Sequence, residues 1–189
     1  MTGLNNLKDK GMNGKNRSLF LDRDGVINVQ KEGGYILHPD EFVFCEGVPE
    51  AMAIMARYFR YIFIVTNQRG IGKGLMTVED LKEIHKKMES GINKAGGRID
   101  GIYFCPDTFE GSPNRKPNPG MGFQAKRDYP GVDFSTSVMV GNTPGDMRFG
   151  KGLGMHNIFI TSTIFPAPDL PGLIDETFPC LHDYARSFE

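Results

Sequence analysis

Two aspartates lie one residue apart directly after a short apolar run, in the stretch SLFLDRDGVIN at 18–28. Asp22 ends the run, and Asp24 follows after a single arginine. Paired carboxylates of this kind are common in solvated turns, but they also hold divalent cations or share nucleophilic and proton-transfer roles. Which of these two interpretations is right depends on the other polar residues that the fold brings beside them.

The elements that would position these aspartates alternate regularly along the chain. Apolar spacing predicts strands at 18–22, 61–67, 99–105, 137–142 and 157–161, and helices at 48–59, 77–97, 119–129, 145–154 and 180–188. The Pro-rich stretch 163–172 is expected to be a loop. Strands that alternate with helices predict an α/β fold with a mainly parallel sheet covered on both faces.

Ligands of such sheets bind beyond the carboxyl ends of the strands. Polar residues follow four of the five predicted strands there: Asp22, Asp24, Thr66, Asn67, Arg115, Lys116, Asn142 and Asp146. We therefore expect one oxygen-rich site at that edge, suited to Mg²⁺ and phosphate. Such a site would carry out phosphoryl transfer, with Asp22 attacking phosphorus and Asp24 moving the proton.

Four motifs, LDRDGVIN at 21–28, VTNQRGIGKG at 65–74, RKPNPGM at 115–121 and VGNTPGDM at 140–147, resemble those of the haloacid dehalogenase superfamily. The resemblance is strongest to the branch that contains the D-glycero-D-manno-heptose 1,7-bisphosphate phosphatases and the histidinol-phosphatase domains. It implies a three-layer Rossmann-like core with strand order 5-4-1-2-3 and no large cap domain.

The resemblance also implies roles for individual residues. It implies Asp22 as nucleophile, Asp24 as acid and base, and Thr66, Asn67 and Lys116 as phosphate-binding residues. It further implies Mg²⁺ as cofactor, and we expect its ligands among Asp22, Asp24, Asn142 and Asp146. The expected substrate is a small phosphorylated metabolite, first of all a heptose 1,7-bisphosphate, whose remaining anionic part Lys73 and Arg115 would hold.

The chain departs from that branch at two places. In the loop CPDTFEGSPNRKP, Cys105 is present, but Ser112 and Asn114 stand where the branch has later zinc-binding cysteines. One thiolate cannot build a tetrahedral zinc site, so we expect no structural zinc and an ordinary, partly buried Cys105. Asn142 stands where the family has an acid, which leaves a neutral ligand for the metal ion.

The bulk composition narrows the class of protein. The chain has 189 residues, a net charge of −1 and three cysteines, which favours a cytoplasmic protein without disulfides and with no membrane or nucleic-acid partner. We expect a flexible leader at 1–17 and a single phosphatase domain at 18–189, with oligomerisation left open. The alternative functions are a histidinol-phosphate phosphatase, a nucleic-acid 3′-phosphatase and a non-catalytic module that binds a phosphorylated ligand.

Overall fold

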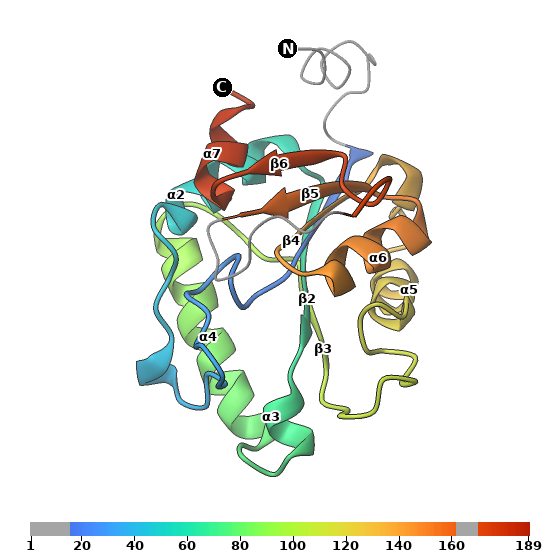
Figure 1. Cartoon of the computed structure of the whole chain (residues 1–189). Coiled ribbons are helices and arrows are strands. Elements are labelled where there is room, and N and C mark those ends of the chain that lie inside the picture. Colours follow the sequence, from blue (N-terminus) through green and yellow to red (C-terminus); the bar gives the residue numbers. More distant parts are fainter. Residues whose placement is uncertain (1–15, 162–169) are drawn as a thin grey trace.

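The computed structural model describes residues 16–161 and 170–189, and its centre is a wholly parallel sheet (Figure 1). Its strands are β1 (Ser18–Leu21), β2 (Tyr61–Asn67), β3 (Gly101–Cys105), β4 (Val138–Gly141), β5 (His156–Ile160) and β6 (Glu176–Phe178). They lie in the order β3-β2-β1-β4-β5-β6. The expected order 5-4-1-2-3 is confirmed, and β6 extends the sheet beyond β5.

Helices cover both faces of this sheet. The longer ones are α2 (Val48–Tyr58), α4 (Val78–Lys94), α5 (Gly120–Asp128) and α6 (Pro144–Leu153), and the shorter ones are α3 (Arg69–Gly72) and α7 (Leu181–Arg186). Figure 1 shows α2, α4 and α7 on one face and α5 and α6 on the other. Short 3-10 turns occur at η2 (Pro39–Glu41) and η3 (Phe134–Thr136). The expected three-layer α/β architecture is confirmed.

Strand β1 lies at the centre of the molecule and contributes to both hydrophobic cores. Leu19 and Leu21 join the core beneath α2 and α4, while Phe20 points to the opposite core, which contains residues of α5 and α6. This alternation follows from the two-residue period of a strand. Leu21 pairs with Ile64 of β2 and Val140 of β4, so the chain leaves the sheet between two neighbours at Asp22.

Local capping fixes the start of two helices. Thr77 and Asp80 form a capping box at α4, and Thr143 and Asp146 form another at α6. In each box the hydroxyl and the carboxylate satisfy backbone N–H groups that the helix itself leaves unpaired. The box at α6 matters for function, because it places Asp146 beside the carboxyl end of β4.

The structure differs from the sequence expectations in two elements. Strand β6 and the single turn α3 were not expected, because three residues and four residues are too short for a periodic pattern. The predicted leader 1–17 and the predicted loop 163–172 fall largely on residues 1–15 and 162–169, outside the described part. Between β1 and α2, residues 22–47 carry only η2, so the described chain holds no large cap domain there.

Candidate active site

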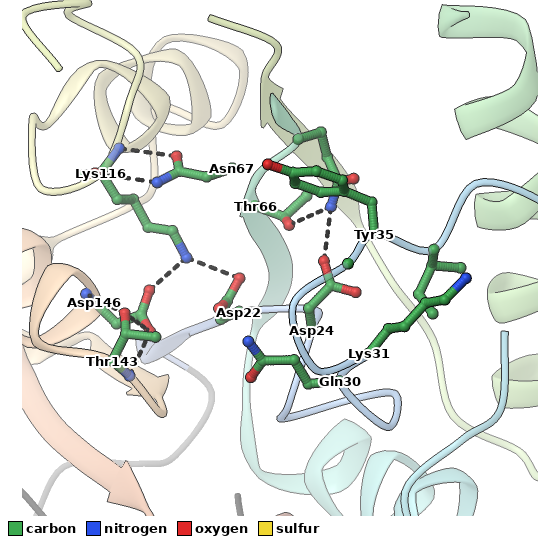
Figure 2. A pocket seen from close by; sticks show the side chains of 13 residues that line it. Asp22, Asp24, Gln30, Lys31, Tyr35, Thr66, Asn67, Lys116, Thr143 and Asp146 are labelled. Atoms are coloured by element: carbon green, nitrogen blue, oxygen red, sulfur yellow. Dashed lines mark hydrogen bonds and ion pairs between the residues drawn. The ribbon is translucent and has the colours of Figure 1, made fainter. Parts of the chain in front are cut away.

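Three charged side chains meet at the carboxyl end of β1. Lys116 extends its Nζ to within 2.9 Å of Asp22 Oδ1 and 2.6 Å of Asp146 Oδ1. The backbone N–H of Arg23 also donates to Asp22 Oδ1, at 2.8 Å. Figure 2 shows Lys116 reaching down between the two carboxylates from the loop before α5. The structure therefore brings Asp22, Lys116 and Asp146 together as the sequence predicted.

The charges in this cluster do not balance. Burial raises the pKa of Asp22 to about 7, and the neighbouring Asp146 carboxylate adds to the rise against the opposing effect of Lys116. Burial alone would lower the Lys116 pKa, but the two carboxylates outweigh it and raise that pKa above its ordinary value. Two buried carboxylates thus share one ammonium group, and a further cation would relieve the excess negative charge.

Asp146 uses both carboxylate oxygens within the protein. Oδ1 pairs with Lys116, while Oδ2 accepts hydrogen bonds from the backbone N–H groups of Asn142 and Thr143, at 3.2 and 3.0 Å. The Thr143 hydroxyl donates to the same oxygen at 2.7 Å. The geometry thus shows Asp146 as an anchor for Lys116, and its role as a metal ligand stays a prediction.

The carboxylate of Asp24 is held by three neighbours. Arg23 donates through Nη2 to Oδ1 and Oδ2, at 2.7 and 2.9 Å, and through Nε to Oδ1 at 3.3 Å. Asn28 donates to Oδ1 at 3.0 Å, and Gln68 donates to Oδ2 at 2.9 Å. Burial alone would raise the Asp24 pKa, but the Arg23 charge and these hydrogen bonds lower it below its ordinary value.

Thr66 and Asn67 end β2 and, as expected, line the polar cavity that Asp22, Asp24 and Lys116 also line. Asn67 makes two hydrogen bonds with the backbone of Lys116: its Nδ2 donates to the carbonyl at 3.1 Å, and its Oδ1 accepts from the N–H at 3.0 Å. The Thr66 hydroxyl accepts a bond from Gln68 at 2.9 Å. The Asn67 amide therefore fixes the lysine loop, a role that the sequence did not predict.

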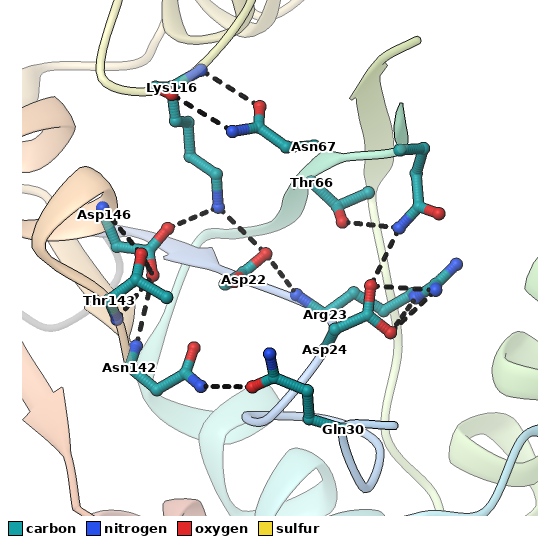
Figure 3. A network of polar contacts seen from close by, with 11 residues as sticks. Asp22, Arg23, Asp24, Gln30, Thr66, Asn67, Lys116, Asn142, Thr143 and Asp146 are labelled. Carbon is teal, nitrogen blue, oxygen red and sulfur yellow. Dashed lines mark hydrogen bonds and ion pairs between the residues drawn. The ribbon is translucent and has the colours of Figure 1, made fainter. Parts of the chain in front are cut away.

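Asn142 is fully buried next to Gln30 (Figure 3) and is not among the residues that line the cavity. Its Nδ2 donates to Gln30 Oε1 at 3.1 Å, so the amide nitrogen is turned toward Gln30. Gly25, at φ +88°, allows this packing, because a Cβ there would lie 2.2 Å from that nitrogen. A glycine at this position is required both by its backbone conformation and by the close approach of Asn142.

A polar cavity of about 180 Å³ opens over these groups. Its walls include Asp22, Asp24, Thr66, Asn67, Lys116 and Asp146, together with Gln30, Lys31, Tyr35, Gln68 and Thr143. Lys73 and Arg115, predicted to bind substrate, are not among the lining residues. The Lys73 ammonium lies 5.1 Å from the centre of the Tyr35 ring, so Lys73 borders a residue of the cavity wall. Arg115 donates a hydrogen bond to the Asp107 carbonyl at 3.4 Å and is thereby held within the loop before Lys116.

The loop between β3 and Lys116 is held by hydrogen bonds. Ser112 donates to the Asp107 carboxylate, and the Cys105 sulfur lies 3.7 Å from both partners. Cys105 is fully buried, which is more than the partial burial that the sequence suggested. Among the described residues, no group of three or more His, Cys, Asp or Glu side chains is arranged to hold a metal ion.

Sequence reasoning missed several residues of the site. Arg23, Asn28 and Gln68 surround Asp24, and Gln30 holds Asn142, yet none of them was assigned a role. Arg23 and Gln68 stand inside the quoted motifs LDRDGVIN and VTNQRGIGKG, which was the available signal. Gln30 carried no signal, because its contact joins segments 112 residues apart.

A family model described as HAD-hydrolase-like matches residues 113–185, which contain the lysine loop, β4 and α6. The match spans less than half of the chain, but together with a parallel sheet whose central strand ends in Asp22 it points to a hydrolase of the haloacid dehalogenase type. In the described residues, no helix is long and apolar enough to cross a membrane.

Curated relatives refine this class. The chain is 39% identical over 150 residues to D-glycero-alpha-D-manno-heptose-1,7-bisphosphate 7-phosphatase of Burkholderia mallei, covering 75% of this chain and 77% of that one. It is 37% identical over 181 residues to D-glycero-beta-D-manno-heptose-1,7-bisphosphate 7-phosphatase of Escherichia coli O6:H1, covering 91% and 94%. The chain belongs to this family of haloacid dehalogenase-like phosphatases.

A solved structure agrees with this assignment. The D,D-heptose 1,7-bisphosphate phosphatase from B. bronchiseptica, crystallised with magnesium and phosphate, superposes with a TM-score of 0.82 at 28% sequence identity. The match covers 91% of this chain and 97% of that one. The shared fold thus extends over nearly the whole length of both chains.

Proposed function

We propose that this phosphatase hydrolyses one phosphate of D-glycero-D-manno-heptose 1,7-bisphosphate, with Mg²⁺ as cofactor and an aspartyl-phosphate at Asp22. The observation that carries the proposal is the cluster of Asp22, Lys116 and Asp146 at the end of the central strand. The names of the relatives, all heptose bisphosphate phosphatases, support the substrate.

The donor set fits a magnesium ion. The Asp22 carboxylate, the Asp24 backbone carbonyl and the Asn142 amide oxygen are hard oxygen ligands, which Mg²⁺ prefers. The raised Asp22 pKa is the second argument, because burial and the Asp146 carboxylate both disfavour the ionised Asp22, which a neighbouring cation would favour. When bound, the ion would screen the charge of the phosphate from that of Asp22. Asp146, predicted as a fourth ligand, acts in this proposal through Lys116.

In the first step, Asp22 attacks the phosphorus atom. A bond forms between a carboxylate oxygen and phosphorus, the bond from phosphorus to the sugar oxygen breaks, and Asp24 gives that oxygen a proton. Lys116 stays beside Asp22 and offsets the charge of the transferring group. Anionic phosphate near Asp24 raises its pKa, and this favours the protonated acid that the step needs.

In the second step, Asp24 acts as a base. It takes a proton from a water molecule, whose oxygen attacks phosphorus and breaks the bond to Asp22, and inorganic phosphate leaves. The Arg23 charge and the hydrogen bonds that lower the Asp24 pKa suit this step, because they favour the ionised form. In this proposal the cavity holds the reacting phosphate, while Lys73 and Arg115, outside its lining, contact the distant part of the substrate.

The test is phosphate release from a small panel of substrates. Purified protein with Mg²⁺ is given both anomers of the heptose bisphosphate, histidinol phosphate and a 3′-phosphorylated oligonucleotide, and Asp22→Asn serves as the inactive control. We expect the highest kcat/KM for a heptose bisphosphate and no release by Asp22→Asn. A higher kcat/KM for histidinol phosphate or the oligonucleotide would replace the substrate. Release from none of them would favour the non-catalytic binding module.

A further inference from the structure

Two arginines border the cavity without lining it. Arg69 begins α3 directly after Gln68, and Arg115 directly precedes Lys116, and both of these neighbours are residues of the cavity wall. The proposed reaction gives Arg69 no task at all. It gives Arg115 only a general contact with the distant part of the substrate.

The two guanidinium groups are held by neighbouring points of one loop. Arg69 Nη2 donates to the Thr108 carbonyl at 3.2 Å, and Arg115 Nη1 donates to the Asp107 carbonyl at 3.4 Å. Because these carbonyls belong to consecutive residues, one short stretch of backbone holds both cations. Burial lowers the Arg115 pKa below its ordinary value, and the charge of Arg69 lowers it further.

Tight packing fixes α3 against this loop. A Cβ at Gly72 would lie 2.4 Å from the Pro106 carbonyl oxygen and 3.1 Å from Thr108 Cγ2. Only a glycine lets the helical turn approach the loop so closely. The turn and the loop therefore hold the two arginines as one unit, with one guanidinium group from each.

Positive charge exceeds negative charge around this arginine pair. Among the described residues, Arg69 has one carboxylate neighbour, Glu110 at 4.0 Å, whose side chain is 90% exposed. Arg115 has no ion-pair partner in that part of the chain, and the Asp107 carboxylate is engaged by Ser112. An exposed pair at such a distance offsets little charge. The Arg69 side chain is itself 35% exposed, so an anion from solution can reach it.

Lys73 adds a third cation and connects the pair with the cavity. It follows α3 directly, and its N–H donates to the Arg69 carbonyl at 3.0 Å. Its ammonium group lies 5.1 Å from the centre of the Tyr35 ring, which belongs to the cavity wall (Figure 2). A substrate whose reacting phosphate lies beside Lys116 would therefore extend past Tyr35 toward these cations.

We propose that Arg69 is a specificity-determining residue, which forms with Arg115 and beside Lys73 a subsite for a second phosphate group of the substrate. The planar guanidinium fork is suited to this task, because it can donate two parallel hydrogen bonds to phosphate oxygens. The inference rests on the proposed function, since the first phosphate must react at Asp22. A sugar monophosphate leaves the subsite empty and gains nothing from it.

The test compares two substrates that differ in one phosphate. The relatives are named 7-phosphatases, so the pair is heptose 1,7-bisphosphate and heptose 7-phosphate, which lacks the distant phosphate. Arg69→Gln removes the charge but keeps an N–H donor for the Thr108 carbonyl. We expect it to lower kcat/KM for the bisphosphate about 10-fold, mainly through KM, and to change kcat/KM for the monophosphate less than about 2-fold.

The matched control is Arg127→Gln on α5, whose guanidinium group is 72% exposed and lies beside one acid, Asp128, at 3.5 Å. It should leave both substrates unaffected. Equal losses on both substrates in Arg69→Gln would assign Arg69 to holding the loop and overturn the proposal. An unchanged kcat/KM for the bisphosphate would overturn it as well.

Binding to the inactive variant Asp22→Asn supplies a readout that needs no turnover. In the presence of Mg²⁺, calorimetry should find tighter binding of the bisphosphate than of the monophosphate, and the additional change Arg69→Gln should remove most of that difference. Equal affinities in Asp22→Asn, or a difference that survives Arg69→Gln, would contradict the proposal. Failure of the proposed function looks different, because the wild type itself would then release no phosphate from either heptose.

Discussion

Replacing Asp22 with Asn should abolish activity and yet stabilise the metal-free protein. The structure raises the Asp22 pKa from its ordinary 3.8 to about 7, chiefly by burial and then through Asp146. Each pKa unit corresponds to about 1.4 kcal/mol, so the ionised carboxylate costs the folded state up to about 4 kcal/mol. An asparagine of nearly the same shape removes that cost and can still accept the bond from the Arg23 N–H.

The direction of the pH dependence follows from the same values. Between pH 3.8 and pH 7 the folded protein keeps the Asp22 proton while the unfolded chain has released it. The contribution of Asp22 to the free energy of unfolding, in EDTA, therefore falls as the pH rises through this window and levels off above it. Asp22→Asn lacks this contribution, and we expect it to be more stable than wild type by about 2 to 4 kcal/mol near pH 8.

Urea unfolding in EDTA, followed from about pH 5 to about pH 8, measures the difference directly. Asp40→Asn is the matched control, because that carboxylate is 90% exposed, and its effect should stay within about 0.5 kcal/mol. Mg²⁺ should then stabilise the wild type near pH 8 much more than Asp22→Asn. The reasoning is refuted if Asp22→Asn is less stable than wild type near pH 8 without metal.

Three further predictions concern the rest of the site. Gly25→Ala should destabilise the fold by about 3 kcal/mol or more, because at φ +88° the added Cβ would lie 2.2 Å from Asn142 Nδ2. The control Gly33→Ala, at φ +63° and with open space around the added Cβ, should cost about 1 kcal/mol. Equal shifts in Tm for the two variants would contradict this. Asn142→Asp adds a charge to the oxygen ligands and should tighten Mg²⁺ binding about tenfold by calorimetry, and unchanged or weaker binding would argue against Asn142 as a ligand. Elemental analysis of purified protein should find no stoichiometric zinc. A zinc-selective chelator in excess Mg²⁺ should leave the Tm unchanged, because hydrogen bonds around Cys105 hold its loop. One bound zinc per chain would show that this loop is built differently.

The sequence predicted those parts of the protein that depend on local patterns. The apolar run before Asp22 and the helical spacing around α2 and α4 are local, and so the alternating strands and helices and the convergence of Asp22, Lys116 and Asp146 could be foreseen. The order of the strands came from the resemblance to the haloacid dehalogenase superfamily. The short strand β6 could not, because three residues carry no period and its ends are set by pairing with β5.

Contacts between distant segments account for what the sequence missed. Asn67 was predicted to bind phosphate, and the structure adds that its amide is bonded to the Lys116 backbone 49 residues away. Lys73 and Arg115 lie outside the cavity lining, and their contact with the distant part of the substrate stays a prediction. Side-chain direction decides these cases, and it is fixed only when the loops are packed together.

The most direct test of the account is to find the atom that carries phosphate during turnover. The enzyme is mixed with substrate and Mg²⁺, quenched with acid within one turnover and treated with borohydride, which converts an aspartyl-phosphate to homoserine that mass spectrometry locates. The account predicts homoserine at Asp22. With para-nitrophenyl phosphate, whose leaving group needs no proton, the yield should be greater in Asp24→Asn, because the base of the second step is missing. Homoserine at another carboxylate, or none in an active preparation, would contradict it.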